Sequence, residues 1–307
     1  MHNYDNLPFR QFTTKSEADK AINSLKGILL GINLDKNIND SELSELKNWC
    51  SKHHDLVNRN PFKEFMLVIA ETLREDANRE ELIEDLFWQC QKYEGDSYFY
   101  NGATADLQTL QGICHGILAD ASINDQEVAA LDKWLEENEH LASYYPYDEL
   151  RSLVVSVLSD GKIDDNERKR LMAYFNEFVN LTDAELTSKI KYEIADVTIS
   201  GICTVDPNIN FTDKVFCFTG LSKRATRSDI EKQIKALGGV FSNNVTKSTD
   251  YLIVGDGGNP CWAFACYGRK VETAVGLRKQ GHQISLVHEF DFWDFVEDNK
   301  SASNLSA

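Results

Sequence analysis

The sequence predicts two domains of different fold class: an all-α helical-repeat domain over residues 15–180 and an α/β domain over residues 210–298. Two observations support this division. A segment with helical periodicity recurs at a constant offset of 85 residues, which indicates an internal duplication. Beyond residue 210, short apolar runs alternate with helical segments, as in a parallel sheet covered by helices. We expect four strands and three helices in that second domain.

Residues 1–14 show no clear period and are predicted to form an arm. Residues 26–49, KGILLGINLDKNINDSELSELKNW, return as residues 111–134, QGICHGILADASINDQEVAALDKW. Glycines, isoleucines, acidic residues and a final tryptophan recur at matching positions. The duplication predicts that residues 24–49 and 109–134 adopt the same helix-turn-helix shape.

Each repeated turn carries a helix-start signal. Residues 158–175 contain a third copy of the turn, and residues 65–88 contain a weaker fourth. An Asn or Asp followed three residues later by Glu is the spacing of a capping box, in which each side chain accepts a hydrogen bond from the other residue's amide. Three pairs have this spacing: Asn39 with Glu42, Asn124 with Glu127, and Asp164 with Glu167.

The acidic turns resemble those of TerB-like tellurite-resistance domains, a family whose turns have been associated with metal. The resemblance covers little more than the turns. It implies that Asp35, Asp120 and Asp160 are candidate ligands for a divalent cation, although the loop spacing of an EF-hand is absent. Helix capping explains these acids without a metal, and we favour that interpretation.

Residues 181–209 are predicted to be a linker with a short helical stretch. A strand follows in KVFCFTG, residues 214–220, and ends at Thr219 and Gly220. The next helix has apolar residues at helical spacing and stops at the pair Gly238 and Gly239. A second strand then precedes the third strand, YLIVG at residues 251–255, which is apolar throughout.

The order of elements completes the second domain. Arg269 and Lys270 open another helix, ISLV at residues 284–287 forms a fourth strand, and residues 289–298 form a last aromatic-rich helix. Phe292 and Trp293 are expected in its core face. The predicted order is βαββαβα, and residues 299–307 are expected to be a disordered tail by composition.

Residues 210–298 resemble a BRCT domain, the breast-cancer-protein C-terminal repeat. The resemblance rests on the FTG strand end, the glycine pair, the block VTKSTDYLIVG and the lysine at the start of the second helix. The segment TRSDIEKQI is most similar to the BRCT modules of bacterial NAD-dependent DNA ligases and of the clamp-loader large subunit. One departure is the segment DGGNPCWAFACY, residues 256–267, which is longer and more aromatic than the family's usual loop.

The resemblance implies a phosphate pocket formed by Thr219, Gly220 and Lys270. Ligands of parallel sheets gather at the carboxyl ends of the strands, where a hydroxyl, a free amide and a lysine can bind phosphate oxygens. Arg227 matches the basic residue by which the ligase and clamp-loader class is thought to hold a DNA 5′-phosphate. The alternative is that Thr219 and Gly220 only end a strand, since many BRCT domains bind no phosphate.

Three aromatic residues, Trp262, Phe264 and Tyr267, fall in the long loop before the second helix. Such rings can stack on bases or contact a protein partner. They can equally pack over the second helix, which is the interpretation that we favour.

The net charge of −17 is unevenly distributed. Residues 206–307 hold 12 basic and 12 acidic residues, so the whole acidic excess lies in residues 1–205. We expect the N-terminal half to repel polyanions and to favour basic partners or cations, although a solvated helical surface has the same composition.

The sequence shows no membrane-length apolar run and no apolar signal-peptide core. We therefore expect no membrane association, a bacterial-type cytoplasmic location, and seven reduced cysteines. Cys261 and Cys266 lack the second Cys or His pair of a zinc site.

The chain lacks the Lys-x-Asp-Gly ligase motif, a Walker loop and a GxSxG elbow. The sequence thus predicts a protein without enzymatic activity or cofactor, an adaptor of genome maintenance and DNA repair. Its BRCT domain would bind a phosphate on DNA (a 5′-phosphate end) or on a phosphorylated protein, and its helical domain a protein partner. The alternative is a metal-responsive, calcium-type helical stress protein with a structural BRCT appendage, which a calorimetric calcium titration would identify.

Overall fold

The computed structural model describes residues 8–34, 38–58, 61–74, 77–94, 102–179, 181, 183–197, 203–255 and 269–305. The chain divides into two compact units. One contains residues 1–140 and 164–197, and the other contains residues 141–163 and 198–307. Among the helices that the structure describes, none combines the length and the apolar character needed to cross a membrane.

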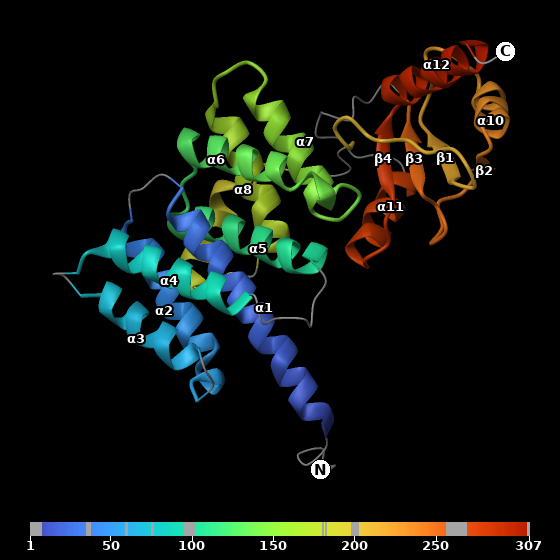
Figure 1. The fold of residues 1–307 in the computed structure, drawn as a ribbon. Helices are drawn as coiled ribbons and strands as arrows, with labels where there is room; N and C mark the ends of the chain where they lie inside the picture. Colours follow the sequence, from blue (N-terminus) through green and yellow to red (C-terminus); the bar gives the residue numbers. More distant parts are fainter. Residues whose placement is uncertain are drawn as a thin grey trace. The chain divides into compact units, whose positions relative to one another are not determined.

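The first unit is helical (Figure 1). Its α-helices are α1 (Pro8–Ile32), α2 (Asp40–Lys52), α3 (Phe62–Thr72), α4 (Arg79–Glu94), α5 (Gly102–Ile117), α6 (Asp125–Glu137), α8 (Asp165–Phe178) and α9 (Ala184–Glu193). Short 3₁₀ turns follow α2 and α5, namely η1 (His54–Leu56) and η2 (Leu118–Asp120). The predicted arm is wrong from Pro8 onward, because α1 begins there and proline is tolerated in the first turn of a helix. Helix α9 lies inside the predicted linker.

All three predicted capping boxes are present. In the first, the Asn39 side chain accepts from the Glu42 amide at 3.0 Å, and the Glu42 carboxylate accepts from the Asn39 amide at 2.7 Å. The boxes at the starts of α6 and α8 have the same reciprocal pattern. The repeated Asn/Asp and Glu therefore satisfy backbone amides that a helix start leaves unpaired.

The two copies of the duplication pack against each other through glycines of α1 and α5. A Cβ atom added at Gly27 would lie 2.1 Å from the Thr109 carbonyl oxygen, and one added at Gly112 would lie 2.4 Å from the Ser24 carbonyl oxygen. Gly31 and Gly116 make an equivalent contact one turn on. The repeated Gly-x-x-x-Gly spacing thus lets two helix backbones touch, a role that the sequence pattern alone did not reveal.

The duplication extends further than the sequence analysis showed. Helices α3 and α7 (Tyr147–Leu158) each follow a proline, Pro61 and Pro146, at the same offset of 85 residues. Arg79 donates to the Ile38 carbonyl and pairs with Asp40 at 2.8 Å. In the second copy, Arg168 donates to the Ile123 carbonyl and pairs with Asp125 at 2.6 Å. Each copy is therefore a set of four helices, α1 to α4 and α5 to α8.

Gly27→Ala should lower the free energy of unfolding by about 1 to 3 kcal/mol, the usual cost of overpacking a close contact. The added methyl group meets backbone rather than a flexible side chain, so one of the helices must shift. Gly102→Ala is the matched control, because a Cβ at Gly102, the first residue of α5, meets nothing within 4 Å. Urea unfolding followed by circular dichroism measures both. Equal stability of the two variants would contradict the prediction, because the methyl group added at Gly27 would then cost no more than one added in open space.

The second unit holds a parallel sheet in the order β2-β1-β3-β4 (Figure 1). Its elements are α7, β1 (Val215–Thr219), α10 (Arg227–Ala236), β2 (Val240–Ser242), β3 (Tyr251–Val254), α11 (Arg269–Lys279), β4 (Ser285–His288) and α12 (Glu289–Leu305). The sheet elements confirm the predicted βαββαβα order, the four parallel strands and the three helices. The predicted tail is wrong as far as residue 305, because α12 continues to Leu305.

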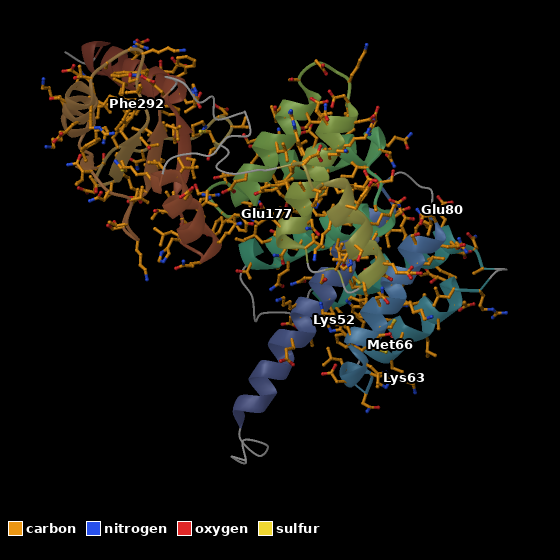
Figure 2. The ribbon with its side chains drawn as sticks, turned by 180° about the vertical axis from the view of Figure 1, so that it is seen from behind. Lys52, Lys63, Met66, Glu80, Glu177 and Phe292 are labelled. Atoms are coloured by element: carbon orange, nitrogen blue, oxygen red, sulfur yellow. The ribbon has the colours of Figure 1, made fainter. Side chains whose placement is uncertain are left out.

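Buried residues cover both faces of this sheet. One face packs Phe216, Phe218, Ile230, Ile234 and Phe292 together, and the other packs Cys217, Leu252, Val271 and Ala274. Phe292 and Trp293 are buried, as predicted. Figure 2 labels Phe292 on α12. Gly238 follows α10 with a φ of +88°, a conformation that suits glycine at a helix end.

A buried ion cluster joins α7 to α11 within the second unit. The Arg278 side chain is fully buried and binds Glu149 through two bonds, Nε to Oε1 at 2.5 Å and Nη2 to Oε2 at 2.8 Å. Asp148 lies 3.5 Å from the same guanidinium. Burial raises the pKa of Asp148 to about 6, and the charge of Arg278 opposes that rise. The sequence analysis placed α7 in the helical domain, whereas the structure groups it with the sheet.

Among the cysteines that the structure describes, one differs from the prediction. Cys50, Cys90, Cys114 and Cys217 form no disulfide, but Cys203 is disulfide-bonded. Sequence spacing could not show which thiols approach one another in space. Cys261 and Cys266 lie outside the described residues.

Candidate functional site at the carboxyl end of the sheet

The site begins where β1 ends. Thr219 is the last residue of β1, and its carbonyl accepts from the Gly255 amide at 2.9 Å. Gly220 follows with a φ of +81°, a value that side chains other than glycine rarely adopt. A Cβ added at Gly255 would lie 2.5 Å from the Leu221 carbonyl oxygen. Glycines after two neighbouring strands therefore allow the chain to turn sharply and keep this edge open.

Lys270, the second residue of α11, reaches back to β1. Its ammonium group donates to the Phe218 carbonyl at 3.0 Å. Burial raises the pKa of the nearby Cys217 thiol, and the charges of Lys270 and Arg227 oppose that rise. The Lys270 charge is thus fixed one residue before Thr219.

Arg227 approaches the same place from another element. It is the first residue of α10, which begins after the N-cap Thr226, whose side chain accepts from the Asp229 amide. The Arg227 side chain is exposed, and its guanidinium carbon lies 5.5 Å from the centre of the Phe218 ring. In the part of the chain that the structure describes, the Thr219 hydroxyl has no hydrogen-bond partner. The fold thus gathers Thr219, Gly220, Arg227 and Lys270 around the end of β1.

The loop after Gly220 contributes residues that the sequence analysis did not single out. The Ser222 hydroxyl accepts from the amides of Arg224 and Ala225, each at 3.0 Å, and contacts Glu289. The Arg224 guanidinium lies 4.9 Å from the centre of the Trp293 ring and pairs with Glu297. The available sequence signal for such a turn is a serine in a loop, because its hydroxyl can accept a hydrogen bond from the amide two residues later. These contacts hold the loop between β1 and α10 in place.

Other predicted site residues lie elsewhere. Trp262, Phe264 and Tyr267 fall outside the described residues, and so does Asp35. The Asp120 carboxylate accepts from the Asn39 side chain at 3.1 Å and the Ser122 amide at 2.8 Å. The Asp160 carboxylate accepts from the Lys162 amide at 3.0 Å.

These turn contacts bear on the metal hypothesis. Across the described ranges, no group of three or more His, Cys, Asp or Glu residues is placed to hold a metal ion. The carboxylates of Asp120 and Asp160 instead bind amides of their own turns. Metal binding at these turns stays the alternative interpretation, and helix capping the favoured one.

The strands and helices define the C-terminal region as a small α/β domain built on a four-stranded parallel sheet. Residues 207–296 match the BRCA1 C Terminus (BRCT) domain family. This confirms the predicted BRCT domain. The resemblance of the helical turns to TerB-like domains stays a prediction.

Several bacterial DNA ligases are similar to part of the chain. The ligase of Fervidobacterium nodosum is 31% identical over 155 residues, covering 50% of this chain and 20% of the ligase. That of Fusobacterium nucleatum subsp. nucleatum is 35% identical over 105 residues, covering 34% and 14%. That of Petrotoga mobilis is 24% identical over 214 residues, covering 58% and 30%. The chain therefore spans less than a third of the length of these relatives. No solved structure matches it significantly.

Proposed function

We propose that this protein is a non-enzymatic adaptor in DNA replication or repair whose BRCT domain binds a phosphate group. The ligand is a 5′-phosphate end of DNA or a phosphorylated protein. The observation that carries the proposal is the gathering of Thr219, Gly220, Arg227 and Lys270 at the end of β1. The similarity to DNA ligases supports the DNA side of the proposal, and the acidic helical unit supports a protein partner there.

The donors at this edge suit a phosphate. An ammonium group has three donors, of which one at Lys270 binds the Phe218 carbonyl, so that the group can still donate to a ligand. The Thr219 hydroxyl and the Gly220 amide add neutral donors, and the exposed guanidinium of Arg227 can bind two phosphate oxygens at once. Hydrogen bonds to a charged group are stronger than neutral ones, so this set favours an anion over a neutral ligand.

The role of the acidic helical unit follows from charge. The excess of acidic residues lies in residues 1–205 and opposes extended contact with DNA. A short ligand such as a single DNA end or a phosphopeptide avoids this repulsion better than a long duplex track. We propose a bacterial-type cytoplasm as the location, where such ligands occur.

Fluorescence anisotropy of the full chain tests the ligand class. The probes are a 5′-phosphorylated duplex, the same duplex without the phosphate, and a phosphopeptide with its unphosphorylated form. We expect one phosphorylated probe to bind at least tenfold more tightly than its unphosphorylated partner. Its affinity should fall as salt increases, because charge contacts are screened. Equal binding of each phosphorylated and unphosphorylated pair would contradict the proposal.

A further inference from the structure

A cavity of about 460 Å³ lies in the helical unit, where α2 of the first copy meets η2 of the second copy and the start of α9. Polar residues on its walls include Ser41, Ser44, Glu45, Asp120, Asp183 and Lys189. Its volume is in the range of small-molecule sites, roughly 300 to 1,000 Å³. The residues that line it therefore decide which ligand it could take.

Glu45 is a buried acid on the wall of this cavity. It is 2% exposed, its Oε2 lies 2.6 Å from Nε2 of His115 on α5, and its Oε1 accepts from the Asn48 side chain at 2.9 Å. A carboxylate can accept about four hydrogen bonds, so each oxygen can still accept one from a ligand. Asp120 and Asp183 bind amides at a turn and a helix start, whereas Glu45 lies in the interior of α2. Helix capping, which explains the other two acids, therefore does not explain Glu45.

The second copy of the duplication supplies an internal comparison. At the offset of 85 residues, the counterpart of Glu45 is Ala130 and that of His115 is Leu30. Both copies nonetheless build the same four helices with matching capping boxes. Burying a charged side chain costs free energy even when the side chain is paired. Since the fold forms with aliphatic residues at these positions, the pair of Glu45 with His115 indicates a role in binding rather than in packing.

The walls of the cavity carry more acid than base. Glu185 joins the three carboxylates already named, and Lys189 supplies an ammonium group. That ammonium group donates to the Asp120 carbonyl at 3.0 Å, so it is held beside η2. An acidic, partly buried wall attracts a cation. In the described part of the chain these carboxylates form no group of three placed to hold a metal ion, which favours a larger, organic cation.

We propose that this cavity, the Glu45 cavity, binds an organic cation with an ammonium or guanidinium head. The head group donates to the Glu45 carboxylate, and its charge offsets the cost of burying that carboxylate. The carbon chain of the ligand lies against Ala119 and Leu186, the apolar part of the wall. Such a head group belongs either to a free amine or to a lysine or arginine side chain of a partner protein. This inference does not depend on phosphate binding by the sheet domain.

Isothermal titration calorimetry of the full chain tests the cavity with three probes. Putrescine represents a free amine, N-acetyl-arginine amide represents a protein side chain, and calcium chloride represents a metal ion. Glu45→Gln removes the charge and keeps the shape of the side chain. The double variant Glu45→Ala with His115→Leu gives the cavity the residue types of the second copy, those of Ala130 and Leu30. Glu84→Gln is the matched control, because it removes an exposed carboxylate of α4.

The expected result is saturable binding of at least one organic probe, and the probe that binds identifies the source of the head group. Glu45→Gln and the double variant should each weaken that binding at least tenfold, and Glu84→Gln should leave it unchanged. In urea unfolding the double variant should be at least as stable as the wild type, since a buried ion pair is often replaced by apolar residues without loss. Binding of neither organic probe, or binding that Glu45→Gln does not weaken, would overturn the proposal. A double variant less stable than the wild type would do the same, because the pair would then serve packing.

Discussion

Arg278→Met should destabilise the second unit by about 3 to 5 kcal/mol, the usual cost of removing one partner from a buried ion pair. The Arg278 side chain is fully buried and is held by Glu149 and the carbonyls of Ser143 and Ile284. Without it, the carboxylates of Glu149 and Asp148 remain buried with no cation beside them. The cost of burying these two carboxylates is then no longer offset by their attraction to the guanidinium of Arg278.

Urea unfolding of the full chain, followed by the near-ultraviolet signal of the aromatic residues, measures this effect. Lys235→Met is the matched control, because Lys235 pairs with Glu231 on the exposed surface of α10 and such pairs contribute about 1 kcal/mol or less. The double variant Arg278→Met with Glu149→Met should recover part of the lost stability, since it removes the unpaired charge together with its partner. A loss at Arg278 no larger than that at Lys235 would show that water reaches the cluster.

The double variant Thr219→Ala with Lys270→Ala should weaken binding of the phosphorylated ligand by about 3 kcal/mol or more, which is a hundredfold or larger loss of affinity. Each charge-assisted hydrogen bond contributes about 1.5 to 3 kcal/mol, and the variant removes one neutral and one charged donor. The Lys270 ammonium already lies against the end of β1 through the Phe218 carbonyl, so the ligand need not order that side chain. Titration by anisotropy with the probe that binds the wild type gives the two dissociation constants.

Lys247→Ala is the control for this experiment. It removes an exposed lysine from the loop between β2 and β3, where no predicted phosphate residue lies. Lys247→Ala tests whether general positive charge, rather than the strand-end site, attracts the ligand. If it weakens binding as much as the double variant does, or if the double variant binds like the wild type, then the proposed pocket is wrong.

Much of the candidate site was accessible from the sequence. The strand end at Thr219 and Gly220 follows an apolar run, and Lys270 opens a helix, so topology alone places them at one edge of a parallel sheet. Arg227 was also named as a site residue, from the resemblance of the segment TRSDIEKQI. The packing of its guanidinium on the Phe218 ring was not, because a contact between a helix start and a strand depends on how the two elements cross.

The sequence by itself determined the local features of this protein. Capping boxes, helix-ending glycines and apolar strands depend on residues within a few positions of one another, so short-range spacing predicts them. The duplication was likewise visible as a constant offset. These features define the two fold classes and the order of their elements.

The tertiary structure alone decided which distant residues meet. The contact of Gly27 with Gly112 and the burial of Arg278 against Glu149 both join positions far apart in the chain. Residue type does not identify the partner in such contacts. An arginine on α11 would ordinarily be expected at a solvated helix position. Arg278 is buried because α7 brings the carboxylates of Asp148 and Glu149 to it, whereas Glu64, 85 residues before Glu149 on α3, is exposed.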